Sequence, residues 1–223
     1  MTIRRALLTV ALVTVAIAAA VPSADAGVVL SPVSATASST FDASTDISNT
    51  YTQVGLLPPF VSGVTDWATY FAGVPLKNFL FTNEWFSESG VARALVTYDL
   101  GAVYSLATLA LWNEDTNGIG NTNILASIDG VNYAPVVLDF VPVQGPINVD
   151  YTAQFLSLGG ASARYIQFEI TECPNPAALG AFNGCAIGEV AFESVAGVVP
   201  EPMSGALLVA GLVALGVARR RRA

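Results

Sequence analysis

Aromatic rings, carboxylates and amides on loops and strand ends are the side chains of this sequence that suggest a binding site. Sugar recognition needs a flat aromatic face for the apolar side of the ring, together with carboxylates or amides that fix the hydroxyl groups. For Trp67 and Trp85, packing in the core or beneath a loop is the alternative role, and Trp112 is expected in the core. The candidates for ligand contact are Trp67, Tyr70, Glu84, Trp85, Asn113 and Glu114.

Catalytic chemistry is limited because the chain contains no histidine. Ser-His-Asp and Cys-His machinery is thereby excluded, as are most catalytic zinc sites. A glycosidase needs only a pair of carboxyl groups, but nothing in the sequence singles out such a pair, and we expect no enzyme activity. Cys173 and Cys185 are expected to form a disulfide, because a cysteine pair in an exported chain favours one.

The N-terminal segment has the three parts of a secretory signal peptide. Arg4 and Arg5 form a positive region, residues 6–21 are almost continuously apolar, and Ala24 and Ala26 are small residues suited to signal peptidase. The prediction is a signal peptide over residues 1–26 and a mature chain that begins at Gly27. An uncleaved N-terminal anchor is the alternative.

The C-terminal segment, residues 198–223, is also tripartite. An apolar run over residues 205–218 would form a helix of about 21 Å, short for a bilayer core of roughly 30 Å, and the arginines after it would stay on the cytoplasmic side. The motif residues are Pro200, Glu201, Pro202, Arg219, Arg220, Arg221 and Arg222.

This tail resembles the PEP-CTERM sorting signal of Gram-negative bacteria. The resemblance implies a transient partner, the membrane protease exosortase, and a passage through the inner membrane. The body of the protein would then reach the cell envelope, the cell surface or the extracellular matrix. An ordinary C-terminal membrane anchor is the alternative, and it too would leave the body outside the cytoplasm.

The region between the two terminal segments is strongly acidic. Six of the nine Lys and Arg residues lie in the terminal segments, against two of the 17 acids, so residues 27–199 carry a net charge of −12. This sign argues against nucleic acid as a partner and is compatible with divalent cations. Arg93 and Arg164 are expected to form ion pairs with Asp99 or Glu169.

Residues 27–197 are expected to form one domain built from strands. Apolar and polar residues alternate between Ala94 and Leu100 and again over residues 164–170, the period of a half-buried strand. Asp99-Leu100-Gly101 reads as a turn that closes a strand, and Asp129-Gly130 as a hairpin turn. Residues 42–59, 116–123 and 142–148 read as loops, whereas 61–70 and 78–87 show no clear period. The predicted strands cover residues 34–40, 93–100, 106–113, 124–128, 133–141, 154–158, 164–170 and 186–194.

Several short motifs in this region resemble the discoidin family, the coagulation factor 5/8 C-terminal domains. They are Tyr98-Asp99-Leu100-Gly101, then Ser127-Ile128-Asp129-Gly130, Ala163-Arg164-Tyr165, and a closing Gly188-Glu189-Val190. The fold class implied is all-β, a galactose-binding-like jelly-roll β-sandwich, flanked here by an N-terminal signal helix and a C-terminal hydrophobic sorting helix. The region between Thr40 and Ala92 is longer and more aromatic than the first loops of that family.

The resemblance implies a non-catalytic module that binds carbohydrate or exopolysaccharide. The alternative is a structural matrix or adhesion protein with no small-molecule ligand. Discoidin-like modules often hold a structural Ca²⁺, which implies Glu189 as a ligand here, with Asp42, Asp46 or Asn49 supplying loop oxygens. A solvated loop beside a hydrogen-bonded glutamate is the alternative reading of these four residues.

Overall fold

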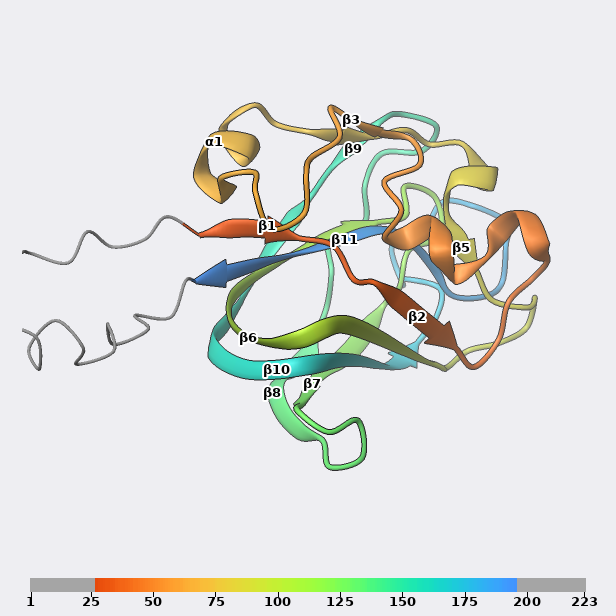
Figure 1. Cartoon of the computed structure of the whole chain (residues 1–223). Helices are drawn as coiled ribbons and strands as arrows, with labels where there is room; N and C mark the ends of the chain where they lie inside the picture. Colours follow the sequence, from red (N-terminus) through yellow and green to blue (C-terminus); the bar gives the residue numbers. More distant parts are fainter. Residues whose placement is uncertain (1–26, 196–223) are drawn as a thin grey trace, which may run out of the picture.

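The computed structural model describes residues 27–195, which form a β-sandwich with a few short helices (Figure 1). The helical segments are η1 (Ala43–Thr45), η2 (Ile47–Thr50), α1 (Trp67–Ala72) and η3 (Phe81–Asn83). The strands are β1 (Val28–Leu30), β2 (Ser34–Ala37), β3 (Leu56–Leu57), β4 (Leu76–Lys77), β5 (Trp85–Phe86), β6 (Ala94–Asn113), β7 (Asn121–Ser127), β8 (Ala134–Phe140), β9 (Tyr151–Thr152), β10 (Gln154–Glu172) and β11 (Ala186–Val195).

The expected signal helix and sorting helix, with the Pro-Glu-Pro motif and the four arginines, lie outside the described residues. Within residues 27–195, no helix has the length and apolar character needed to cross a bilayer.

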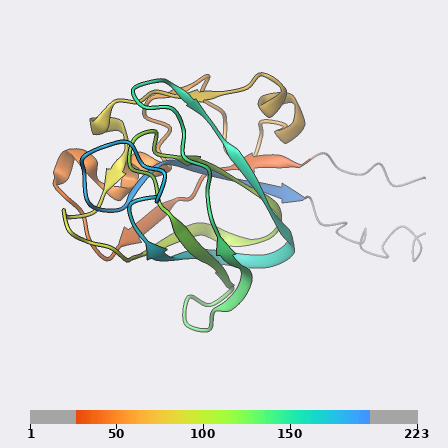
Figure 2. The same cartoon turned by 180° about the vertical axis from the view of Figure 1, so that it is seen from behind.

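The strands pair antiparallel, which confirms the expected all-β sandwich. The main order is β1-β11-β6-β10-β7-β8, with β2 added on β6 and β5 added on β11, and β3-β4-β9 form a second, small sheet. The first part of β6 pairs with β2 and the last part of β10, whereas its second part pairs with β11 and the start of β10. The two long strands therefore bend around the core, as both views show (Figures 1 and 2).

The expected turn at Asp99-Leu100-Gly101 is wrong, because β6 runs through it as one strand. Gly101 takes a left-handed φ of 81°, which only glycine adopts without strain. Pairing with β10 continues on both sides, from Asp99 with Tyr165 to Leu106 with Ala161. The separate strands expected at 154–158 and 164–170 likewise form one strand, β10, with register shifts along it. These glycine-containing motifs mark bends in long strands, not reversals of the chain.

The region between Thr40 and Ala92 contains short helices and two-residue strands where a long loop was expected. Asp42 and Asp46 accept backbone N–H groups at the starts of η1 and η2, a local bonding pattern that favours helix starts. Asp66 does the same for α1 by accepting the N–H of Thr69, within a stretch that showed no clear period. The hairpin between β7 and β8 is confirmed, with Asp129 accepting the N–H groups of Val131 and Asn132.

Aromatic and branched side chains fill the space between the bent strands. Tyr98 packs edge-on against Phe168, and both are fully buried with Phe192. Trp112 is also buried, as expected. The disulfide between Cys173 and Cys185 is present and closes the loop between β10 and β11, a constraint that contributes about 3 kcal/mol in the chain-entropy model.

A fully buried ion pair ties the region after Thr40 to the sandwich. Lys77 Nζ lies 2.8 Å from Glu189 Oε2, and neither side chain is exposed. The same ammonium donates to the carbonyl oxygens of Val54 at 2.8 Å and Asn49 at 3.2 Å. The Lys77 ammonium therefore joins β4, β11 and residues 49–54, three segments that are far apart in the sequence. The expected pairing of Arg164 with Asp99 is confirmed at the surface.

We expect Lys77→Met to lower the free energy of unfolding by about 3–5 kcal/mol at pH 8, because Glu189 would lose its buried partner. Burial raises the pKa of Glu189 to about 7 against the opposing effect of Lys77. Without Lys77 the carboxyl would hold its proton more tightly, so the loss measured by urea unfolding should grow as the pH rises above about 7. Arg164→Met is the matched control. It removes a partly exposed pair that water already screens, and its loss should be much smaller. Equal losses in the two variants would contradict the role given to the buried pair.

Candidate functional site

The six ligand candidates from the sequence lie in two separate places. Glu84 and Glu114 come together where β5 begins and β6 ends, with Trp85 and Asn113 beside them in the chain. Trp67 and Tyr70 lie on α1 instead. In both views, β5 and the loop between β10 and β11 lie at the end of the molecule opposite to the start of β1 and the end of β11 (Figures 1 and 2).

Three of the six candidates form hydrogen bonds within the protein, so their polar side-chain groups are not free to contact a ligand. Trp85 is fully buried and donates its indole N–H to the Ser39 carbonyl. Asn113 uses its amide on both backbone groups of Ile119 and so shapes the loop after β6. Tyr70 is buried and donates its hydroxyl to the Pro58 carbonyl. These three residues were chosen from the sequence for their polar or aromatic character, but in the structure their side chains stabilise the fold.

Glu84 and Glu114 form a buried acidic cluster with Asp115, which the sequence analysis missed. One oxygen of each carboxylate lies within 4.8 Å of the others, and all three residues are buried. Tyr151 in β9 donates its hydroxyl to Glu84 Oε1 at 2.5 Å. The adjacent Glu114-Asp115 pair at the end of a strand was a signal for this cluster, whereas the pairing with Glu84 depends on the fold.

Burial raises the pKa of the two glutamates in this cluster. It raises the pKa of Glu84 to about 8, against the hydrogen bond from Tyr151. It raises the pKa of Glu114 to about 9, and the neighbouring Glu84 adds to the rise. A carboxyl group that holds its proton can both donate and accept hydrogen bonds, as sugar hydroxyl groups require.

Close approach of backbone and side chains holds the cluster in place. A side chain at Gly188 would clash with the Tyr151 hydroxyl, so glycine there allows Tyr151 to reach Glu84. Asn117 donates its backbone N–H to Glu114 Oε2. Gln144 donates its amide N–H to the Glu114 carbonyl at 2.9 Å and to the Asp115 carbonyl at 2.5 Å.

An open hollow of about 180 Å³ lies over the two glutamates. We call it the Phe–Glu hollow. It is smaller than the pockets that hold drug-sized ligands, which suits a single sugar ring. Phe79 and Phe81 are each about 40% exposed at its rim, and Phe86 packs beneath Phe81 with ring centroids 4.5 Å apart. The lining residues are Phe79, Phe81, Glu84, Phe86, Glu114, Thr116, Asn117, Asn148 and Phe182.

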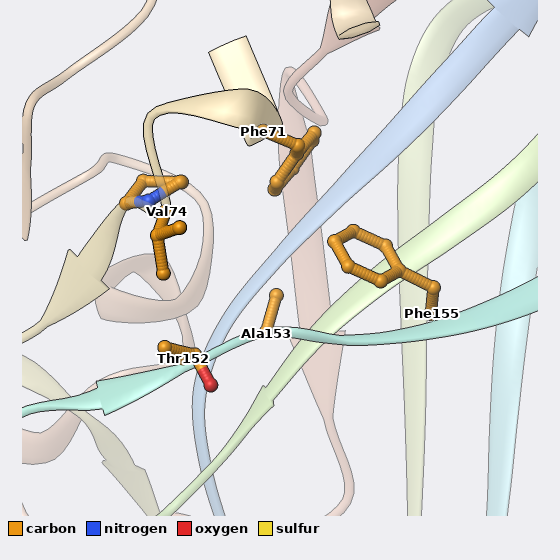
Figure 3. A pocket seen from close by; sticks show the side chains of 6 residues that line it. Phe71, Val74, Thr152, Ala153 and Phe155 are labelled. Carbon is orange, nitrogen blue, oxygen red and sulfur yellow. The ribbon is translucent and has the colours of Figure 1, made fainter.

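A second hollow beside α1 is almost entirely apolar (Figure 3). Phe71 and Phe155 face each other there, with ring centroids 5.0 Å apart, and Trp67 packs on Phe71 at 4.3 Å. The Thr152 hydroxyl is the only polar side-chain group among the six lining residues. This hollow offers aromatic surface but no carboxylate or amide that could orient a sugar.

The four residues expected to hold Ca²⁺ do not form a common ligand set. Asp42 and Asp46 cap η1 and η2, and the Asn49 amide donates to the Ser44, Thr82 and Glu84 carbonyl oxygens. Glu189 faces the ammonium of Lys77, which also occupies the carbonyl of Asn49. The Lys77 ammonium therefore already supplies the positive charge beside Glu189 and the Asn49 carbonyl, and the four residues do not fit a cation.

Comparison with known proteins relates this chain to others by its fold and not by its sequence. No protein-family model matches the chain, and no curated protein matches its sequence. Solved structures do match. Several of the structures it resembles are carbohydrate-binding modules.

One is a selenomethionine-labelled variant of chitosan-binding module 1 from a chitosanase/glucanase of Paenibacillus sp. IK-5, with TM-score 0.50 and 18% identity, over 74% of this chain and 96% of that chain. The unsubstituted module has TM-score 0.48 and 19% identity, over 73% and 95%. A third is CBM32-5 from Clostridium perfringens, solved with GalNAc-β-1,3-galactose, with TM-score 0.45 and 12% identity, over 71% and 93%. The antiparallel sandwich thus agrees with the fold of the first of these modules, and an identity this low shows the fold alone.

Proposed function

We propose that this chain is an exported, non-catalytic carbohydrate-binding module that binds an extracellular polysaccharide or matrix glycan in the Phe–Glu hollow. One observation carries the proposal. The hollow joins exposed phenyl rings at its rim to carboxyl and amide groups at its floor, the combination that sugar rings need. The hollow beside α1 has the rings without the polar groups.

A binding role suits the two glutamates better than hydrolysis. A glycosidase needs one protonated acid and one ionised carboxylate on either side of the scissile bond. Here burial raises the pKa of both Glu84 and Glu114, so the fold does not set the two apart as one acid and one base. The fold shared with carbohydrate-binding modules supports the same reading.

Export and sorting are part of the proposal. The signal peptide would deliver the chain across the inner membrane, and an exosortase-type protease would process the Pro-Glu-Pro tail before the body reaches the cell surface or matrix of a Gram-negative bacterium. The position of the hollow is consistent with attachment of the chain through its C-terminal end. Val28 pairs with Ser194, so both ends of the described chain lie together, far from β5 (Figure 1). A tether at that end would leave the hollow free.

The glycan site is tested by binding to chito-oligosaccharides, GalNAc-galactose and pectin fragments on an array, followed by calorimetry with the tightest ligand. Phe81→Ala should weaken binding about two- to tenfold, since one aromatic contact contributes about 0.5–1.5 kcal/mol. Phe155→Ala is the matched control, because Phe155 is also an exposed ring and lines the other hollow.

Loss of binding in Phe155→Ala, with Phe81→Ala unaffected, would move the site to α1. Failure of every glycan to bind would favour the alternative, a structural matrix or adhesion protein.

The export proposal predicts that chain recovered from the cell surface or medium begins at Gly27. Signal peptidase would remove residues 1–26 after the small residues that precede this position. N-terminal sequencing and intact mass measure the outcome. Recovery of the full-length chain from the cytosol, with Met1 and the terminal arginines still attached, would contradict it.

A further inference from the structure

The acidic cluster of Glu84, Glu114 and Asp115 has the geometry of a cation site. Among residues 27–195, it is the one group of three acidic or cysteine side chains whose ligand atoms approach closely enough to share an ion. All three residues are at most 3% exposed. The two ion pairs of the described chain, Lys77–Glu189 and Arg164–Asp99, involve none of them. Three carboxyl groups are therefore gathered in one buried place without a basic partner.

Oxygen atoms without partners lie near the same place. Five buried side-chain atoms in the described chain have no hydrogen-bond partner, and all five are oxygens. Two of them, Glu84 Oε2 and Asn117 Oδ1, belong to residues that line the Phe–Glu hollow. A third, Gln144 Oε1, belongs to a side chain that binds the Glu114 and Asp115 carbonyls. Buried acceptors are normally paired, so a concentration of unpaired ones indicates a missing partner that offers positive charge or protons.

Asn117 gives the independent indication. Its side chain is 96% buried and lines the Phe–Glu hollow together with Glu84 and Glu114. Its backbone N–H already binds Glu114, while its Oδ1 has no donor. An amide oxygen beside carboxylates is a normal part of a Ca²⁺ ligand set.

We propose that Glu84, Glu114 and Asp115 bind one Ca²⁺ ion at the floor of the Phe–Glu hollow, with Asn117 Oδ1 as a further ligand. Every donor in the cluster is oxygen, which favours a hard cation over zinc or copper. Ca²⁺ tolerates irregular sets of six to eight oxygens, whereas Mg²⁺ needs a near-octahedral one. This site is distinct from the four residues expected from the sequence, where Lys77 supplies the positive charge. It uses the same two glutamates as the glycan proposal, but cation binding is measured without any sugar, so the two proposals can fail separately.

The test uses the purified full-length chain in mild detergent, stripped with chelator and titrated with Ca²⁺ by calorimetry. One saturable site and a rise in melting temperature are expected. Glu114→Gln and Asp115→Asn keep the side-chain shapes and should each weaken Ca²⁺ binding at least tenfold. Asp42→Asn, an exposed acid from the other set, should leave the affinity unchanged. Loss of affinity in Asp42→Asn alone would overturn the proposal.

Terbium luminescence on the unmodified chain keeps the test independent of whether the variants fold. Trp85 follows Glu84 in the chain and Tyr151 contacts its carboxyl group, so bound Tb³⁺ should show sensitised emission that Ca²⁺ displaces. Absence of both a calorimetric signal and sensitised emission would show that protons or water serve the cluster and would overturn the proposal. A chain that binds Ca²⁺ but no glycan would overturn only the proposed function.

Discussion

The buried contact between Lys77 and Glu189 holds together the parts of the molecule that build the hollow. Lys77 lies opposite Tyr151 across the β4–β9 pairing, and the Tyr151 hydroxyl reaches Glu84. Glu189 follows Gly188, the position where only glycine leaves room for that hydroxyl. The ion pair thus holds the small sheet β3-β4-β9 against β11. Through Tyr151, the small sheet in turn positions Glu84 in the acidic cluster.

Burial has opposite consequences for the two sets of acids in this chain. Glu189 has an ammonium that also takes two backbone carbonyls, so its charge is compensated within the fold. Glu84 and Glu114 have each other and Asp115 as neighbours, without a basic group paired to them, and protons or a cation would relieve the repulsion of like charges in a low-dielectric site. The Lys77–Glu189 pair therefore stabilises the fold, whereas the acidic cluster leaves groups that can bind a ligand at the end of the sandwich.

Periodicity and turn motifs predicted the sheet but not the path of its long strands. Alternation from Ala94 and around Ile166 identified real strands, and Asp129-Gly130 identified a real hairpin. Asp99-Leu100-Gly101 looked like a reversal because a bend and a turn both use glycine, and only the partner strand distinguishes them. The short helix at Trp67 escaped notice because six residues are too few to show a helical period.

The candidate site could be predicted only in part, because its partners are brought together by pairing between distant segments. Residue type pointed to Glu84 and Glu114, which do meet, but it could not reveal their burial or their partner Tyr151, whose position depends on a pairing with Lys77. The rim phenylalanines, Phe79 and Phe81, belonged to a stretch without a period, so nothing local marked them as exposed. Nothing in the sequence singled out Lys77, because its role depends on the distant Glu189.

Nuclear magnetic resonance gives the most direct test of the account. Backbone amide shifts would be followed as a binding glycan is added to the isotope-labelled chain. The account predicts that the largest changes fall on Phe79, Phe81, Asn117 and Asn148 around the Phe–Glu hollow. Changes confined to Phe71 and residues 152–155, with the acidic end unaffected, would contradict it.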